Sequence, residues 1–238
     1  MTDPDPWFEA SISQVGGYAA DLIRPGMRLG LGTGRTASAF LDALASRPVA
    51  ELELVAMCTS KRTEERARSL GIRILDSSRE PLDLDLDGAD EIDPELNLVK
   101  GAGGAMVREK IVAERSRRFW VIADSSKVVD RLGDSHPIPL EVLAFDWEGT
   151  AVRVRDSCQG EPKLRGADRP FVTDNGNYVL DLELAPGSWD PQQLVAELDR
   201  IPGVLGHGLF LSTATAALVS DGRSVRVLGN LEAERRVP

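Results

Sequence analysis

Hydrophobic and polar positions follow two different periods along this chain. Between Phe8 and Ile23 apolar residues recur every three or four positions, which predicts an amphipathic helix that ends at Pro25-Gly26. Between Leu82 and Asp87 leucine and aspartate alternate strictly, which predicts a strand with one apolar face. The same patterns predict further helices at 36–45, 61–70 and 105–116, and further strands at 27–31, 51–57, 72–75 and 119–123.

Strands that alternate with helices predict an α/β fold, a Rossmann-like parallel sheet with helices on both faces. After Gly133 the spacing changes to strand, helix, two short strands, a helix at 191–201 and a last strand, which is typical of a small inserted α+β (ferredoxin-like) subdomain. We therefore expect residues 1–133 and 205–238 to form the Rossmann-like domain, closed by strands at 215–219 and 224–228. Residues 134–204 are expected to form the small α+β subdomain.

Composition and charge narrow the possible partners. With 238 residues, of which 42% are hydrophobic, the chain can bury a sizeable core. A net charge of -10 argues against binding of nucleic acid, which needs clustered Lys and Arg. No apolar run approaches the length of a membrane span, and the acidic start MTDPDP lacks the basic and apolar regions of a signal peptide. We expect a cytoplasmic protein that does not bind membranes.

Metal ligands are scarce in the sequence. Cys58 and Cys158 are too isolated for a zinc site or a disulfide framework, and His136 and His207 are the only histidines. One acidic stretch has the spacing of a calcium loop, but Pro94 stands where a bidentate Glu is required. We expect chemistry without metal or cofactor.

The segment KGAGGAMVREKIVA, residues 100–113, places a carboxylate on the apolar face of a predicted helix. At about 100° per residue, Glu109 lies in the middle of an arc of about 120° that also holds Ala105, Met106, Val112 and Ala113. A carboxylate in apolar surroundings has a raised pKa, which is common for catalytic groups in clefts. The alternative is a core glutamate paired with an arginine.

Three loops after predicted strands carry further candidate residues. The first, 30–36, contains Thr33, Gly34, Arg35 and Thr36, and its glycines and helix start suit a phosphate. It matches neither the dinucleotide fingerprint nor the P-loop, and a plain tight turn is the alternative.

The second loop, Asp87-Gly88-Ala89-Asp90, offers two carboxylates and backbone N–H groups that suit an oxyanion hole. Its alternative is a solvated acidic turn. The third loop, 123–127, brings Lys127 to a capped helix start, which by itself indicates no more than a cap.

These motifs together resemble one family, ribose-5-phosphate isomerase of type A. The resemblance runs in order and spacing from about Gly30 to Phe210, through motifs that are several and independent: GLGTGRT, DGADEID, KGAGGAMVREKIVA, ADSSKVVDRLG, PIPLEV, VTDNGNYVLDL and IPGVLGHGLF. It implies metal-independent interconversion of ribose 5-phosphate and ribulose 5-phosphate, a step of the pentose phosphate pathway. Such a reaction moves one proton between adjacent carbons through an enediolate, so it needs one base and fixed partners for the charged oxygens.

The resemblance also implies roles for residues. Glu109 resembles the base, Asp87 and Lys100 resemble the pair that opens the sugar ring and supports charge, and Asp90 lines the same site. The implied substrate-binding residues are Thr33, Gly34, Arg35, Thr36, Asp87, Gly88, Ala89, Asp90, Lys100, Gly101, Ala102, Gly103 and Lys127. We also expect a homodimer or a higher homo-oligomer.

Two departures from the family pattern concern the phosphate. The family has Ser where this chain has Arg35, and it often has Lys near the start of the first helix, where this chain has Ser11 to Gln14. Two other hypotheses stay open at this point: a non-catalytic sugar-phosphate sensor and a nicotinamide-dependent oxidoreductase.

Overall fold

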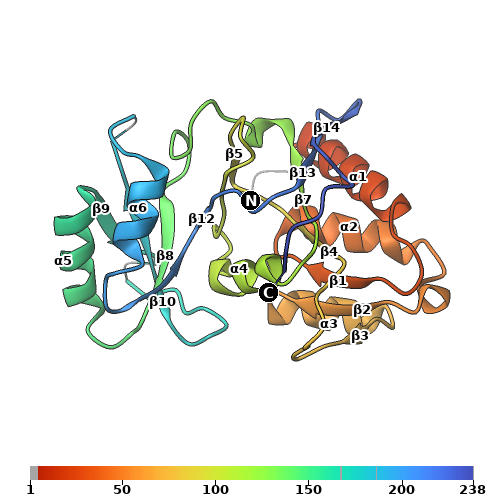
Figure 1. Ribbon diagram of the computed structural model, residues 1–238, viewed down its shortest axis with the longest axis horizontal. Helices are drawn as coiled ribbons and strands as arrows, with labels where there is room; N and C mark the ends of the chain where they lie inside the picture. The colour runs from red at the N-terminus through yellow and green to blue at the C-terminus, as the bar shows by residue number, and fades with distance from the viewer. Residues whose placement is uncertain (1–4, 167, 186, 238) are drawn as a thin grey trace. The chain divides into compact units, whose positions relative to one another are not determined.

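The computed structural model describes residues 5–166, 168–185 and 187–237, so the expectation about residues 1–4 of the acidic start lies outside the described residues. The chain divides into two units, which are described separately (Figure 1). Unit 1 comprises Met1–Ala89, Arg108–Lys127 and Ser212–Pro238, and unit 2 comprises Asp90–Val107 and Val128–Leu211.

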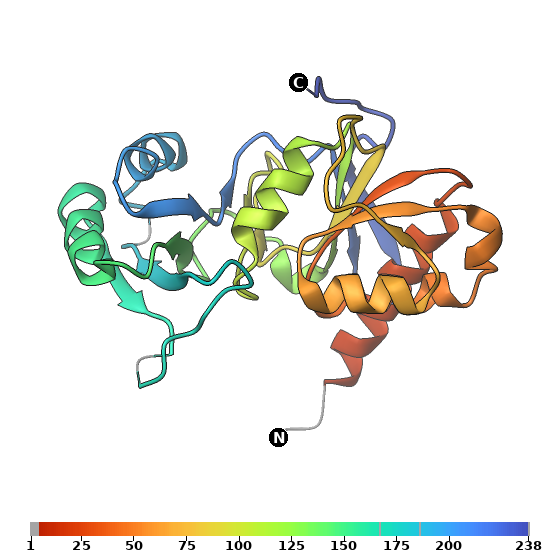
Figure 2. The same ribbon diagram turned by 90° about the horizontal axis from the view of Figure 1, so that it is seen from below.

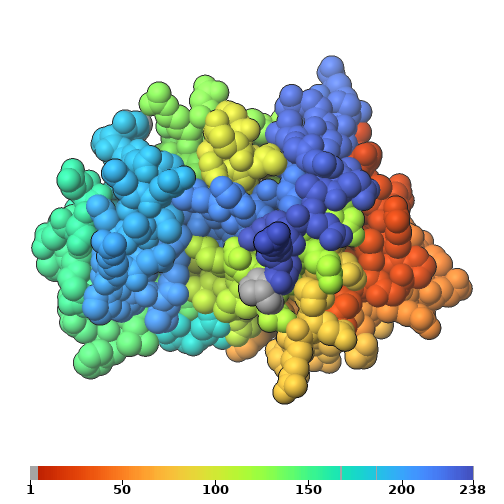
Figure 3. All heavy atoms as spheres, viewed as in Figure 1, coloured from red at the N-terminus to blue at the C-terminus, as the bar shows by residue number. Residues whose placement is uncertain are grey.

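A seven-stranded sheet forms the middle of unit 1, in the order β14-β13-β7-β4-β1-β2-β3. All neighbours pair in parallel except β14, which runs antiparallel to β13. The edge strand β14 is largely exposed and belongs to the blue surface of this unit in Figure 3. The predicted parallel sheet is confirmed, with the strands β1 (Arg28–Leu31), β2 (Val55–Cys58), β3 (Arg73–Ile74), β4 (Leu84–Asp87), β7 (Phe119–Asp124), β13 (Ala216–Ser220) and β14 (Val225–Gly229).

Alternation along β4 gives the sheet two different faces. Leu84 and Leu86 pack into the main core with side chains from α1 (Pro6–Asp21), α2 (Arg35–Ala45) and α3 (Lys61–Ser69). These helices lie on one side of the strands in Figure 2. The aspartates of β4 therefore face the other side. There the helix α4 (Met106–Glu114) packs, because Val112 lies directly over Gly30 of β1. Helices on both faces are confirmed.

Two local differences from the predicted elements have physical causes. The predicted strand 51–57 begins only at Val55, because a 3₁₀ helix, η1 (Val49–Leu52), precedes it and ends at Glu53, whose φ is 49°. The first helix starts earlier than predicted, at Pro6, because the Asp5 side chain accepts the Trp7 N–H at 3.0 Å and proline suits the first helical position.

An antiparallel sheet in the order β11-β8-β10-β9 forms the core of unit 2, with two helices. Its order matches the βαββαβ spacing predicted from the sequence, so the small α+β part of the fold is confirmed. Leucines of the strands and helices, among them Leu140, Leu180 and Leu194, fill its apolar core. The elements are β8 (Ile138–Val142), α5 (Trp147–Cys158), β9 (Glu161–Leu164), β10 (Tyr178–Glu183), α6 (Pro191–Leu198) and β11 (Val204–His207).

A second, three-stranded sheet of unit 2 was not predicted. It consists of β5 (Glu91–Ile92), β6 (Leu98–Val99) and β12 (Leu209–Phe210), each of two residues and too short to show a period. Through this sheet residues 90–107 group with unit 2, whereas the sequence prediction assigned them to the larger domain. None of the described helices is both long and apolar enough to cross a membrane.

Glu91 of β5 is a fully buried carboxylate that caps a loop of unit 2. It accepts the backbone N–H groups of Gly133 at 2.5 Å, Ser135 at 2.6 Å and His136 at 2.8 Å. The His136 Nδ1 lies 3.7 Å from the same carboxylate. Burial raises the pKa of Glu91, but the hydrogen bonds from the His136 side chain and the three amides outweigh it and hold the pKa below its usual 4.5.

We predict that Glu91→Gln lowers the free energy of unfolding by about 1–3 kcal/mol at pH 7, because the amides of Gly133, Ser135 and His136 lose a buried, charged acceptor. A depressed pKa means that the charge of Glu91 stabilises the fold above the unfolded-state pKa, and that this stabilisation is lost as pH falls below 4.5. The difference between wild type and variant should therefore shrink in that range. Urea unfolding from pH 3 to pH 7 measures it, with exposed Glu95→Gln as control. Equal stability of wild type and Glu91→Gln at pH 7 would contradict the assignment.

Candidate active site

Three loops with candidate residues follow three neighbouring strands of unit 1. The glycine loop follows β1, Asp87 ends β4, and the loop with Lys127 follows β7. Since β7, β4 and β1 are adjacent and parallel, all three loops lie at the same carboxyl edge of the sheet. This edge is where parallel α/β sheets bind ligands.

Asp87 connects two of these loops. Its Oδ1 accepts the backbone N–H of Thr33 at 3.0 Å and that of Gly88 at 2.7 Å. A Cβ at Gly32 would lie 2.0 Å from the same oxygen, so this position accepts only glycine. The side chain is fully buried. Asp87 is therefore fixed in one orientation by backbone groups of both loops.

Two threonines that the sequence reasoning missed support the glycine loop. The hydroxyl of Thr59 lies 2.7 Å from the hydroxyl of Thr33, and the hydroxyl of Thr63 donates to the carbonyl of Gly32 at 2.8 Å. Both come from the segment around the end of β2 and the start of α3, next to β1 in the sheet. Only the parallel neighbour strand brings them to the loop, so no local motif could have indicated them.

The start of α2 offers backbone N–H groups at the same edge. Its N-cap, Gly34, has φ 112° and makes no side-chain capping bond, so the first-turn amides, including that of Thr36, lack a side-chain cap. Unfilled N–H groups at a helix start attract anions. Thr36 and Thr33 are both half-buried beside this turn.

The side chain of Arg35 pairs with an acidic neighbour. Its guanidinium donates to the Glu9 carboxylate and stacks over the Phe8 ring, with 4.0 Å from Cζ to the ring centroid. Both partners belong to α1. The side chains of the pair are 61% and 46% exposed, which makes it a surface ion pair. Exposed pairs of this kind contribute little stability.

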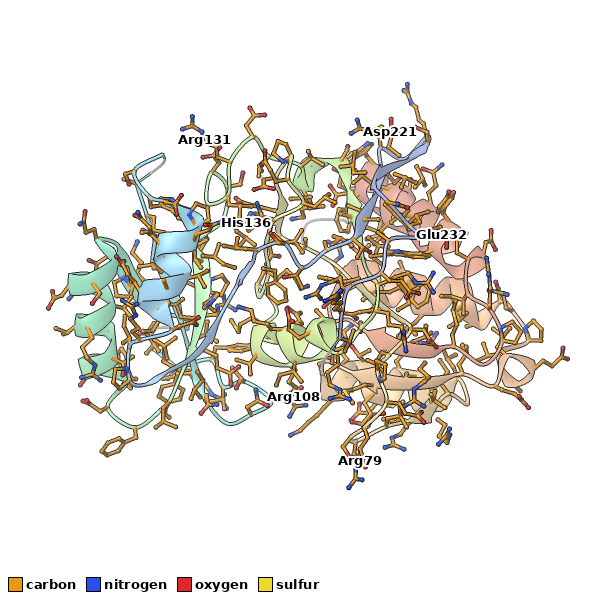
Figure 4. The ribbon with its side chains drawn as sticks, in the orientation of Figure 1. Arg79, Arg108, Arg131, His136, Asp221 and Glu232 are labelled. Carbon is orange, nitrogen blue, oxygen red and sulfur yellow. The ribbon has the colours of Figure 1, made fainter. Side chains whose placement is uncertain are left out.

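Glu109 lies on the inner face of α4, as predicted, with only 4% of its surface exposed. Arg108, its neighbour, projects away from the α4 ribbon (Figure 4). Val112, one turn later on the same face, contacts the position of Gly30. Because α4 leads back to the start of β7, Glu109 lies nearer the carboxyl edge than Val112, by about 4.5 Å for three helical residues. Two strand residues cover about 6.6 Å, so Glu109 lies between the levels of Gly30 and Gly32, near the carboxyl ends of β1 and β4.

Lys127 ends a short 3₁₀ helix, η2 (Ser125–Lys127), where the sequence predicted a capped helix. The predicted cap is present, since Asp124 at the end of β7 accepts the N–H of Ser126 at 3.0 Å and also its hydroxyl. Lys127 itself is half-buried.

The remaining candidate residues belong to unit 2. Asp90 accepts the N–H of Ala102 at 2.9 Å, which ties it to the loop 101–104. Lys100 is 2% exposed, its N–H donates to the carbonyl of Gly208 at 2.8 Å, and its Nζ lies 5.7 Å from the centroid of the Phe210 ring. Asp90, Lys100 and the loop therefore form one local group.

Among the described residues no three His, Cys, Asp or Glu side chains gather in a way that could hold a metal ion. Burial, with the charge of Glu64 against that of Arg68, raises the pKa of Cys58 to about 12. Burial, with the charge of Glu197, raises the pKa of Cys158 to about 11. Both thiols are therefore protonated at neutral pH and poor nucleophiles.

The family model of ribose 5-phosphate isomerase A (phosphoriboisomerase A) matches residues 55–223 of this chain. The chain belongs to this family. A ribose-5-phosphate isomerase A from Roseiflexus castenholzii is 46% identical over 224 residues, which cover 92% of this chain and 94% of that protein.

Solved structures of the family agree with the fold. The ribose 5-phosphate isomerase from Plasmodium falciparum has a TM-score of 0.87 at 33% identity and covers 92% of this chain and 98% of its own. A D-ribose-5-phosphate isomerase in complex with phospho-erythronic acid has a TM-score of 0.83 at 32% identity, with the same coverage of 92% and 98%.

The resemblance seen in the sequence is confirmed, and so is the enzyme class, an isomerase. Neither the non-catalytic sensor nor the oxidoreductase has support among these relatives of the ribose 5-phosphate isomerase A family. The roles of individual residues stay predictions.

We predict that Gly32→Ala reduces kcat/KM at least about 100-fold, because its methyl group would displace the Asp87 carboxylate that both loops depend on. The matched control is Gly17→Ala in α1, where a Cβ meets nothing within 4 Å. That control should keep full activity. Circular dichroism and steady-state kinetics on both variants measure the effect, and an active Gly32→Ala enzyme would show that the position of Asp87 is not required.

Proposed function

We propose that this chain interconverts D-ribose 5-phosphate and D-ribulose 5-phosphate through an enediolate, with Glu109 as the base that moves the proton between the first two carbons. The observation that carries the proposal is the placement of Glu109, a buried carboxylate on the inner face of α4, whose Val112 one turn later packs over Gly30 of β1. One base on one side of the sugar can serve both half-reactions, because it removes a proton from one carbon and returns it to the next.

Charge that develops on the enediolate oxygens needs fixed partners. We assign this role to the ammonium group of Lys100 and to the backbone N–H groups of Ala89 and Gly103, in the turns at 88–90 and 101–104. The amides of Gly88, Ala102 and Gly104 already donate to Asp87, Asp90 and Gly101. Backbone donors of this kind stabilise an oxyanion without reorganising during the reaction. Lys100 is almost fully buried, so its charge acts with little screening by water.

Asp87 and Asp90 are assigned to the sugar hydroxyl groups, including the proton transfer that opens the ring. Asp87 suits the role because two amide hydrogen bonds to Oδ1 fix its carboxylate in place. Asp90 is held by the Ala102 N–H in unit 2. Gly88 and Ala89, between the two aspartates, contribute backbone contacts to the same substrate.

The phosphate is assigned to the glycine loop and the start of α2. Thr33, Gly34 and Thr36 provide hydroxyl and N–H donors, and Lys127 provides a positive charge. Arg35 is included as a ligand that leaves Glu9 when the substrate binds, because a phosphate dianion offers a guanidinium two charge-assisted hydrogen bonds.

We also propose the cofactor requirement, the cellular location and the oligomeric state of the enzyme. The proton transfer requires no metal or cofactor, the protein acts in the cytoplasm without nucleic-acid partners, and it assembles as a homodimer or higher homo-oligomer. These assignments rest on composition, charge and the family resemblance. The activity assays below are therefore run with EDTA present.

We predict that Glu109→Gln keeps the fold and the binding of phospho-erythronic acid but lowers kcat by about 10²- to 10⁴-fold, the usual contribution of a positioned general base. The control is Glu114→Gln on the same helix, an exposed residue that pairs with Arg235 at 3.0 Å. Ketose formation from ribose 5-phosphate measures turnover. A folded Glu109→Gln protein with near-normal kcat would remove Glu109 from the mechanism.

We predict that Arg35→Ser raises KM for ribose 5-phosphate about tenfold or more while kcat changes little, because the phosphate is bound alike in the ground and transition states. Glu9→Gln should lower KM, since it removes the competing carboxylate. Arg66→Ser is the control, because Arg66 forms an exposed pair with Asp42 at 2.6 Å. Unchanged KM in both Arg35→Ser and Glu9→Gln would leave the phosphate to the backbone, the threonines and Lys127.

A further inference from the structure

The loop 101–104 of unit 2 begins and ends at buried glycines with positive φ, and its two middle residues are exposed. Gly101 and Gly104 have φ values of 105° and 75°, and Ala102 and Gly103 between them are exposed. A short segment of this kind has few side-chain contacts of its own, so its conformation depends on what holds its peptide groups. Among the described residues, two side chains do so.

Arg165, immediately after β9, is one of them. Its Nη1 donates to the carbonyl oxygens of Gly101 at 3.0 Å and Ala102 at 2.9 Å. Its Nε and Nη2 donate to the two oxygens of Asp181 on β10, the first at 2.9 Å. The side chain is only 18% exposed. All three guanidinium nitrogens are therefore engaged, and the ion pair anchors the loop to the antiparallel sheet.

The second side chain is Asp90, which accepts the Ala102 N–H at 2.9 Å. This N–H and the Gly101 carbonyl belong to one peptide group, so Arg165 and Asp90 hold that group from opposite sides. Peptide groups in the described chain are all trans, which directs each N–H opposite to its carbonyl.

The next peptide group joins Ala102 to Gly103, and it is held at its carbonyl only. Its carbonyl, that of Ala102, is bound by Arg165, so its N–H, that of Gly103, points away from the guanidinium. No acceptor for this amide occurs among the described residues. Arg165 thus aims an exposed N–H in a defined direction.

We propose that Arg165, held by Asp181, is a positioning residue for the isomerisation, which orients the Gly103 N–H and the Asp90 carboxylate toward the reacting sugar oxygens. The inference rests on the proposed function, because it takes the loop 101–103 as part of the substrate site.

Phe171 supports the same arrangement. A Cβ at Gly104 would lie 2.3 Å from its ring, and the Arg165 guanidinium lies 5.7 Å from the ring centroid. The aromatic ring therefore fills the space beside the loop and limits the directions open to the guanidinium.

Only arginine can hold both partners. Lysine has a single nitrogen at its tip and cannot keep a bidentate pair with Asp181 while it donates to two carbonyls. Arg165→Lys should therefore keep the charge and lose the geometry, which makes it a sharper variant than Arg165→Met.

We expect both Arg165 variants to lower kcat about 10- to 100-fold, with KM within about threefold of wild type, because oxyanion contacts act mainly in the transition state. The primary isotope effect with ribose 5-phosphate deuterated at carbon 2 should rise, since proton transfer becomes slower. Arg155→Lys and Arg155→Met are controls that leave activity unchanged, because Arg155 forms a bidentate pair with Glu161 at 3.0 and 2.8 Å without contacting the loop.

A purely structural role would give a different result, with lower melting temperature but wild-type kcat and isotope effect per folded molecule. That result in Arg165→Lys would overturn the proposal. If neither Arg165 variant folds, Asp181→Asn decides, because it keeps the arginine and loosens its anchor. Wild-type kcat in a folded Asp181→Asn protein would also overturn it. Should wild type itself fail to convert ribose 5-phosphate, the proposed function fails separately, and hydrogen exchange at the Ala102 N–H, which is bonded to Asp90, still tests whether Arg165 orders the loop.

Discussion

The hydrogen bonds that Asp87 accepts from Thr33 and Gly88 are the interaction on which the carboxyl edge of the sheet in unit 1 depends. They connect the loop after β1 to the loop after β4, and they require that position 32 has no side chain. Burying a carboxylate is costly unless donors surround it, and here two of these donors are backbone groups of the proposed substrate loops. The hydrogen bonds that offset the cost of burying the Asp87 carboxylate therefore also fix the positions of the two loops.

In unit 2, charged side chains likewise bind backbone groups of a proposed substrate loop. A backbone amide of the loop 101–104 binds a carboxylate, Asp90, while two carbonyls bind a guanidinium, Arg165. In both units backbone amides bind a carboxylate, and charged side chains thereby hold the peptide groups of the proposed substrate loops in position.

Much of this could be predicted from the sequence, because the deciding patterns are local. The alternation in β4 predicted one apolar face and one acidic face, and the helical spacing around Glu109 predicted its burial in α4. The motifs at 30–36, 87–90 and 100–104 follow predicted strands or precede a predicted helix. Their position at the ends of these elements could therefore also be predicted.

Other features depend on contacts between distant segments and had no local signal. Thr59 and Thr63 reach the glycine loop only because β2 lies beside β1, and Arg165 reaches the loop 101–104 across more than sixty positions of sequence. The pairing of Arg35 with Glu9 depends likewise on how α1 packs against α2. The three-stranded sheet of β5, β6 and β12 consists of strands too short to show a period.

The central claim, proton transfer through an enediolate by a base on α4, is tested most directly by following the fate of the carbon-bound hydrogen in D₂O. Wild-type enzyme is incubated with ribose 5-phosphate over many turnovers, and the ribulose 5-phosphate is analysed by NMR. The account predicts deuterium at carbon 1 of the product, because a carboxylic acid exchanges its proton with solvent between the two half-reactions. Product that forms with no deuterium would indicate a direct hydride shift and would contradict the account.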